Sequence, residues 1–185
     1  IEFLKECLPP IDSDIAKRLR KQLEKKGVKF YLQAGVKRIE NGNVTFERKG
    51  KEETILADTV LIATGRAANI EGLGLEAAGI EVDRKGIVVD EHFCTNVKNI
   101  YAIGDVNGKQ MLAHAAEFQG YHVLNQILGH SDHINFQIMP SAVFTNPEIA
   151  GVGLTEDQCK EQGLNYKCFK SLYRANGKAV SMNAV

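Results

Sequence analysis

The residues best suited to chemistry lie in one stretch, residues 100–114. An apolar run, residues 100–103, ends in Gly104-Asp105, and after a polar turn a helix is predicted to begin near Met111. In open α/β sheets, ligands bind at the carboxyl ends of the strands, where Asp105 would stand. Gly104 has no Cβ and lets a ligand approach the backbone closely. The first turn of the helix would offer unpaired N–H groups and a positive dipole end to the same place.

Two interpretations of this stretch are open from the residue types alone. A buried strand followed by an acidic turn and an ordinary helix explains the Gly-Asp pair more simply. An acid that accepts a hydrogen bond from a sugar-like hydroxyl, beside amides that stabilise negative charge, also suits a flavin. The ribityl chain would then lie on Asp105, and the pyrimidine oxygen would lie on the backbone from Leu112 to His114.

The full string is more specific than the Gly-Asp pair. T-x-x-x-x-I-Y-A-I-G-D at residues 95–105, followed by M-L-A-H at residues 111–114, resembles the second FAD-binding segment of the pyridine nucleotide–disulphide oxidoreductases. Within that family the chain is most similar to the dihydrolipoyl dehydrogenases, and the resemblance covers essentially all 185 residues. It implies that FAD binds to six residues of this stretch: Gly104, Asp105, Met111, Leu112, Ala113 and His114.

The first 32 residues predict a strand–helix–strand unit, which favours a parallel sheet. Asp12, Ser13 and Asp14 are candidate caps for a helix, a glycine at position 27 ends it, and residues 28–32 predict the next strand. Glu2 would lie at the end of the strand before the helix. By position alone it is an exposed terminal residue, but the resemblance implies that it binds the adenosine ribose hydroxyls of NAD and disfavours NADP. The glycine-rich turn that precedes such an acid is absent.

Three short strands, residues 36–39, 44–47 and 53–56, predict a small antiparallel meander. The resemblance implies that the backbone at Val36 approaches the adenine of NAD, although a plain sheet residue explains it equally well. Residues 59–63 form a continuous apolar run that predicts a fully buried strand. The run leads to Gly65, which the resemblance places near the nicotinamide.

The resemblance implies an α/β fold with three parts. Residues 1–66 would form part of a Rossmann-like NAD-binding domain with its β-meander, residues 67–134 a central FAD-contacting segment, and residues 135–185 the start of an α+β interface domain for dimerisation. Further elements are expected from local patterns. They are a short helix at residues 73–78, strands at 80–82, 87–90 and 166–172, and burial of Phe118, Tyr121, Val123 and Leu124.

Composition narrows the class of protein. The net charge is zero and no apolar run approaches the roughly 20 residues of a membrane span, so neither nucleic acid nor a membrane is an expected partner. Four cysteines lie without a C-x-x-C or other metal spacing, so reduced thiols and a reducing compartment are expected, the cytoplasm or the mitochondrial matrix. His130 and His133 form a weak metal pattern in a polar loop, and no metal site is expected.

The resemblance implies electron transfer between NAD(H) and a dithiol or disulphide substrate through FAD, in a homodimer that can join 2-oxoacid dehydrogenase complexes. That chemistry needs a C-x-x-x-x-C disulphide and a His–Glu pair, and the chain has neither. No catalytic residue is therefore expected here, and the chain, which begins inside an apolar run, is expected to be an inactive piece of a longer enzyme. The alternatives are a glutathione- or mercuric-reductase-like enzyme, an NADH oxidase, or a non-catalytic nucleotide-binding or dimerisation module.

Overall fold

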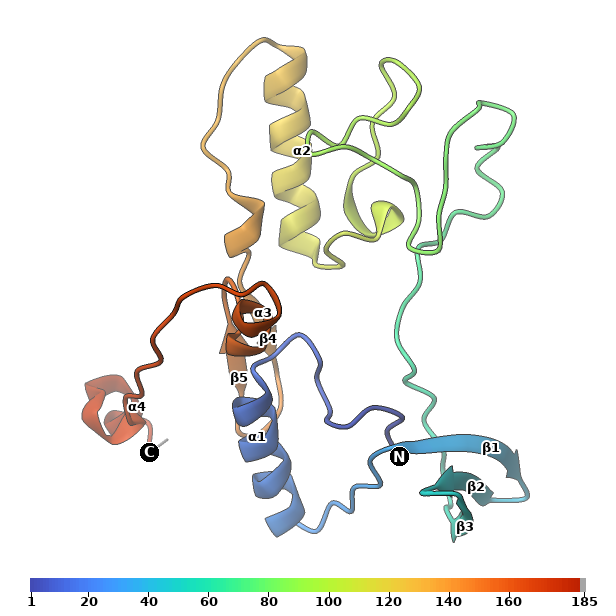
Figure 1. Cartoon of the computed structure of the whole chain (residues 1–185), viewed down its shortest axis with the longest axis vertical. Helices are drawn as coiled ribbons and strands as arrows, with labels where there is room; N and C mark the ends of the chain where they lie inside the picture. The colour runs from blue at the N-terminus through green and yellow to red at the C-terminus, as the bar shows by residue number, and fades with distance from the viewer. Residues whose placement is uncertain (184–185) are drawn as a thin grey trace.

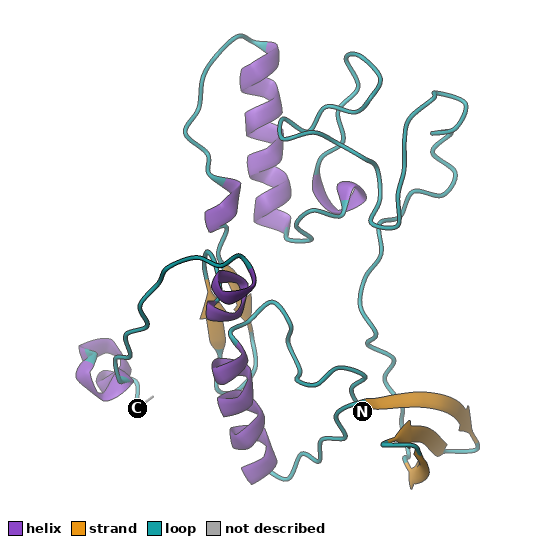
Figure 2. Ribbon diagram, in the orientation of Figure 1, coloured by secondary structure: helices purple, strands orange, loops and turns teal. Residues whose placement is uncertain are grey.

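The computed structural model describes residues 1–183 of the chain. Three regions stand out in Figure 1: a three-stranded sheet, a long helix with loops beside it, and a strand pair with short helices toward the C-terminus. Figure 2 shows that loop, interrupted by one short helical turn, connects the sheet to the long helix. Among residues 1–183, no helix combines the length and the apolar character that a membrane crossing requires.

The predicted meander is confirmed. Strands β1 (Ala34–Glu40), β2 (Asn43–Arg48) and β3 (Lys51–Leu56) pair antiparallel in sequence order. The first turn places both Asn41 and Gly42 at positive φ, as a tight two-residue hairpin requires. Phe46 in the central strand is fully buried.

The chain before the meander pairs with its first residues. The N–H of Glu2 donates to the carbonyl of Tyr31 at 2.8 Å, and the N–H of Ala34 donates to the carbonyl of Glu2 at 2.9 Å. Helix α1 (Ser13–Lys25) lies between these two segments in the sequence, as predicted. Residues 28–32 are not a regular strand, so that part of the prediction is wrong, although the hydrogen bonds bring the two segments side by side.

The apolar run at residues 59–63 is not a buried strand. Leu61 is 87% exposed and Ile62 is 72% exposed, and within residues 1–183 the run has no strand partner. An apolar strand is buried only when neighbouring strands and a covering layer are present, and the described residues supply neither. The run therefore has the composition of a β-strand, but it is not buried as predicted.

Other elements that were predicted from local patterns are absent, or are exposed where burial was predicted. Residues 73–78 form turns, residues 80–90 contain only a single bridge between Val82 and Ile87, and residues 166–172 are irregular. On helix α2 (Ala113–Ile127), Val123 is buried as predicted. Three other predicted core residues of that helix are exposed instead: Phe118, Tyr121 and Leu124. The pattern predicts an apolar face, but burial depends on what covers it.

The last part of the chain contains two short strands and several single helical turns. Strands β4 (Ser141–Val143) and β5 (Ile149–Gly151) pair antiparallel, and helix α3 (Glu156–Glu161) follows with a capping box. The remaining elements are the 3-10 turns η2 (Phe136–Ile138) and η3 (Tyr173–Ala175) and helix α4 (Gly177–Ser181). In Figure 1, α1 lies beside β5 and α3, although they are far apart in sequence.

Two carboxylates join α1 to α3 by a reciprocal exchange. The N–H of Glu156 donates to Asp12 at 2.8 Å, and the N–H of Ser13 donates to Asp157 at 3.3 Å. Each helix start thus takes an acceptor from the start of the other helix: the N-cap Asp12 of α1 and the second residue Asp157 of α3. A negative charge near the positive end of a helix dipole is favourable, so both contacts hold the two elements together.

Acid should weaken this exchange. Hydrogen bonds from the hydroxyl and N–H of Ser13 lower the pKa of Asp157. A carboxyl whose pKa is lowered by folding stabilises the protein above its unfolded pKa of about 3.9, and that contribution is lost as the pH falls through the folded pKa. Asp157→Asn should therefore melt at a lower temperature than the wild type at about pH 6, and the two should converge as the pH falls through the lowered pKa of Asp157.

Thermal unfolding followed by circular dichroism across this pH range is the measurement. Glu161→Gln, which neutralises another acid of α3, is the matched control and should show a smaller difference at every pH. A gap between the wild type and Asp157→Asn that does not change with pH would contradict the assignment.

Candidate functional site

The Gly104-Asp105 pair lies in a tight turn that follows an irregular hairpin. Residues 100–103 were predicted as a strand, but only Tyr101 forms a bridge, to Cys94. The turn itself is the 3-10 element η1 (Gly104–Asn107). Gly104 has φ 76°, and a Cβ there would stand 3.1 Å from the Cβ of Ala116 on α2. Glycine is therefore required both by the backbone conformation and by the close approach of the helix.

A buried glutamine fixes this turn on α2. The Oε1 of Gln119 accepts hydrogen bonds from the N–H of Gly104 at 2.7 Å and from the Nδ2 of Asn107 at 2.9 Å. The same Nδ2 donates to the carbonyl of Ala102 at 3.0 Å. Gln119 and Asn107 are both buried, so these bonds form away from competing water. Together they hold the turn in one conformation.

Sequence reasoning missed both of these amides. Gln119 shares the buried face of α2 with Ala115 and Val123 at a spacing of four residues, so the sequence could have predicted its position on the core side. A polar residue on such a face needs a buried partner, and the nearby turn offers unpaired N–H groups. What the sequence could not show is that Gly104 and Asn107 would supply those partners.

Asp105 is exposed, as a residue that meets a ligand must be. Its turn is anchored by the hydrogen bonds of Gln119 to Gly104 and Asn107. A second anchor comes from residues 85–87, because the N–H of Ile87 donates to the carbonyl of Val106 at 2.9 Å. The carboxylate thus stands at the surface on a rigid support, rather than in a packed interior.

The start of α2 is open to a ligand. Leu112 precedes the helix, no side chain caps it, and the first turn carries no acidic residue. The predicted helix start near Met111 is correct to within two residues. The Nε2 of His114 contacts the carbonyl of Pro140 at 2.9 Å, so the side chain is engaged with the next region of the chain. The backbone of Ala113 and His114 is then the part that can meet a ligand.

One buried polar atom close to this helix start has no partner. The Nε2 of Gln110 donates to the carbonyl of Phe136 at 2.7 Å, but its Oε1 is buried without a hydrogen bond among the described residues. Gln110 also lines a cavity of about 450 Å³ with Phe93, Gln119 and Phe136. An acceptor left unpaired beside a cavity fits a bound molecule that donates to it. None of the six residues predicted to bind FAD lines this cavity, so what suits the flavin is the exposed Asp105 near the uncapped start of α2.

The other predicted cofactor residues lie in the sheet region. Glu2 accepts a hydrogen bond from the N–H of Leu4 at 2.8 Å, and its backbone pairs with Ala34 at the start of β1. Val36 in β1 is half-exposed beside an irregularity in the strand pairing. Gly65 has φ 116° and open space on its Cα. Glu2 and Val36 are thus brought to the same end of the sheet, and the described contacts do not link Gly65 to them.

Comparison with known families then decides the identity of the chain. Residues 1–120 match the family described as pyridine nucleotide-disulphide oxidoreductase, and residues 139–184 match its dimerisation domain. The chain belongs to the pyridine nucleotide–disulphide oxidoreductase family. Members of this family use FAD and NAD(H), so the family, its mixed α/β fold and its cofactors are confirmed as predicted.

Dihydrolipoyl dehydrogenases are among the proteins to which the chain is similar. The chain is 40% identical over 99% of its length to a mitochondrial dihydrolipoyl dehydrogenase of Pisum sativum, and 42% identical over 96% to a dihydrolipoyl dehydrogenase of Bacillus subtilis. It spans only 38% and 39% of the lengths of these two relatives. These relatives therefore agree with the resemblance seen in the sequence.

Solved structures give the same answer for the fold. LpdA from Mycobacterium tuberculosis matches with a TM-score of 0.83 at 28% identity, covering 98% of this chain and 40% of that one. The flavoprotein disulphide reductase RclA from Escherichia coli matches with a TM-score of 0.78 at 31% identity, covering 98% of this chain and 42% of that one. The chain thus shares its arrangement with part of each of these proteins.

The anchoring role of Gln119 can be tested by substitution. Gln119→Leu removes the acceptor of Gly104 and Asn107, and a buried donor left unpaired costs about 1–3 kcal/mol. We expect the free energy of unfolding in urea to fall by about that amount and amide exchange at Gly104 to accelerate.

Gln119→Glu keeps an acceptor at the same place and should retain most of the protection at Gly104. Gln22→Leu, at an exposed glutamine of α1, is the matched control and should change little. If amide exchange at Gly104 is unchanged in Gln119→Leu, Gln119 does not anchor the turn.

Proposed function

We propose that this chain forms the NAD- and FAD-contacting part of a dihydrolipoyl dehydrogenase-like oxidoreductase. The observation that carries the proposal is the turn at Gly104 and Asp105, held from behind by buried Gln119 and facing the uncapped start of α2. The exposed carboxylate of Asp105 can accept a hydrogen bond from a ribityl hydroxyl. The N–H groups at the start of α2 can stabilise the developing negative charge on a pyrimidine oxygen.

In this proposal the protein positions the two cofactors and supplies the electrostatic field around them. FAD, when bound, carries electrons between the nicotinamide and a disulphide. Glu2 accepts from the two ribose hydroxyls of NAD and repels a 2′-phosphate, while Val36 and Gly65 offer backbone to the adenine and the nicotinamide. Support comes from the side-by-side placement of Glu2 and β1.

We further propose the division into residues 1–66 for NAD, 67–134 for FAD and 135–185 for the interface domain. The interface part supports a homodimer, since residues 139–184 match a dimerisation domain. A dihydrolipoyl substrate and docking to 2-oxoacid dehydrogenase complexes follow from the branch of the family. Free thiols at all four cysteines suit a reducing compartment, which we take to be the cytoplasm or the mitochondrial matrix.

The role of Asp105 can be measured as FAD affinity in the longest gene product that contains this chain. Asp105→Ala removes a charge-assisted hydrogen bond of about 1.5–3 kcal/mol, so the Kd for FAD should rise about 10- to 100-fold. Asp58→Ala, at an exposed acid in the loop after β3, is the control and should bind FAD like the wild type. Equal affinities in both variants would reject the proposed contact.

A second test concerns the catalytic machinery. The 185-residue chain has no C-x-x-x-x-C disulphide. We therefore expect no lipoamide-dependent oxidation of NADH by this chain alone, followed as loss of NADH absorbance. Measurable turnover above that of a heat-denatured sample would show that the chain contains a redox centre that the proposal omits.

A further inference from the structure

Two side chains at the start of α2 are bonded to residues 136–140, the segment that returns from the far end of the helix and that we call the returning segment. The Nε2 of Gln110 donates to the carbonyl of Phe136 at 2.7 Å, and the Nε2 of His114 lies 2.9 Å from the carbonyl of Pro140. A carbonyl oxygen only accepts hydrogen bonds, so the Nε2 of His114 carries the hydrogen and donates it. Each bond joins residues 26 positions apart, so the two bonds are in register.

These two bonds bracket the backbone that is proposed to meet the flavin. Gln110 comes directly before Met111, and His114 is the last residue assigned to the pyrimidine oxygen. No side chain caps the helix, because the donors and acceptors of both bonds lie elsewhere. The stretch is thus fixed at both ends without a side chain covering the N–H groups of the first turn.

The returning segment is itself held in one conformation. It begins with the 3-10 turn η2, in which the side chain of Asn135 accepts from the N–H of Gln137 at 2.9 Å. The ring of Phe136 packs edge-on against Phe93, with centroids 4.9 Å apart. At the other end, Pro140 has a fixed φ and leads directly into β4. The two carbonyl acceptors therefore belong to a restrained piece of backbone.

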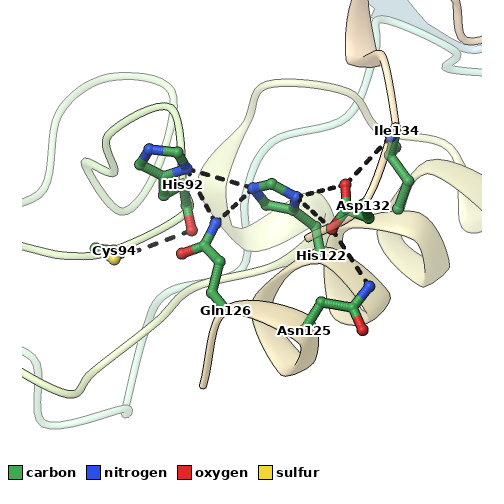
Figure 3. Close-up of polar contacts among 7 residues, drawn as sticks. All are labelled: His92, Cys94, His122, Asn125, Gln126, Asp132 and Ile134. Carbon is green, nitrogen blue, oxygen red and sulfur yellow. Dashed lines mark hydrogen bonds and ion pairs between the residues drawn. The ribbon is translucent and has the colours of Figure 1, made fainter. Parts of the chain in front are cut away.

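The loop before the returning segment is fixed to the second half of α2. Figure 3 shows that the carboxylate of Asp132 accepts from the N–H of Ile134, at 3.2 Å, and from Asn125, at 3.3 Å. The same carboxylate lies 2.9 Å from the Nδ1 of His122. The chain that leaves α2 is therefore turned back along the helix before it reaches the returning segment.

A fixed helix start matters for a ligand because hydrogen bonds weaken steeply as their geometry departs from the ideal. Donors that are already in place are most effective where negative charge develops, since they do not have to reorganise. The first turn of a helix is also where fraying begins. Each bond to the returning segment opposes that fraying, on either side of the amides that would face the flavin.

We propose that Gln110 and His114 are positioning residues for FAD, which act by tying the start of α2 to the returning segment. This role rests on the proposed function, and it adds that FAD affinity depends on a segment that the proposed flavin contacts do not include. Linked binding equilibria are reciprocal, so bound FAD holds the returning segment more firmly in its turn.

Titration of FAD into the longest gene product that contains this chain is the test. His114→Phe keeps an aromatic ring but removes the donor, and Gln110→Met keeps the length of the side chain but removes the amide. Each should raise the Kd for FAD about 2- to 10-fold, as expected for the loss of one hydrogen bond. His114→Gln, whose Nε2 can reach the same carbonyl, should recover most of the affinity lost in His114→Phe. His130→Phe, at an exposed histidine after α2, is the matched control and should bind FAD like the wild type.

Amide exchange supplies a readout that a merely structural role would not move. In the wild type, FAD should slow exchange in the returning segment and β4 more than in the meander, which serves as the internal control. This difference should shrink in His114→Phe. Circular dichroism establishes that each variant is folded before it is titrated.

The outcomes separate this role from the flavin site itself. If Asp105→Ala weakens FAD binding but His114→Phe and Gln110→Met do not, the positioning role is wrong and the flavin site stands. The role is also overturned if His130→Phe weakens binding as much as His114→Phe does. If Asp105→Ala binds FAD like the wild type, the flavin site is wrong and the positioning role falls with it.

Discussion

The structure around the proposed flavin site depends on one buried carbonyl oxygen. The Oε1 of Gln119 accepts from Gly104 and from Asn107, and through them it sets the conformation of the turn that presents Asp105. In a low-dielectric interior a satisfied amide network is strong, and a broken one is costly. The exposed acid can therefore be rigid although it makes few contacts of its own.

The same helix serves two purposes. Gln119 of α2 supports the flavin turn, while His122 and Gln126, on the same side of the helix, lie in a cluster with His92. Both arrangements use a side chain of the helix to fix a loop that comes earlier in the sequence. The long helix is thus a common support on which irregular backbone is held in defined positions.

Local signals in the sequence predicted local structure well. The three short strands of the meander, and the acidic start and the glycine end of α1, are signalled within a few residues, and the structure agrees with them. The apolar run at residues 59–63 has the composition of a buried strand, yet burial is a property of neighbours that the run itself does not encode. Phe118 and Tyr121 on α2 differ from the prediction for the same reason.

The candidate site could likewise be predicted only in part from the sequence. Gly104 and Asp105 could be found because their residue types and their place after an apolar run carry a physical meaning. The pairing of Gln119 with Asn107, and that of His122 with Asp132, depends on how loops fold back on α2. Spacing along the chain does not report such contacts, and only the three-dimensional arrangement reveals them.

The exchange of carboxylates between α1 and α3 has a kinetic consequence. Asp12 meets Glu156, and Asp157 meets Ser13, across 144 positions of the chain in each case. Closing a loop of that length costs entropy before any contact repays it, whereas the three-stranded meander closes only short turns. We therefore expect the meander to form early during folding, and the docking of the two helix starts to be a late, topologically slow event.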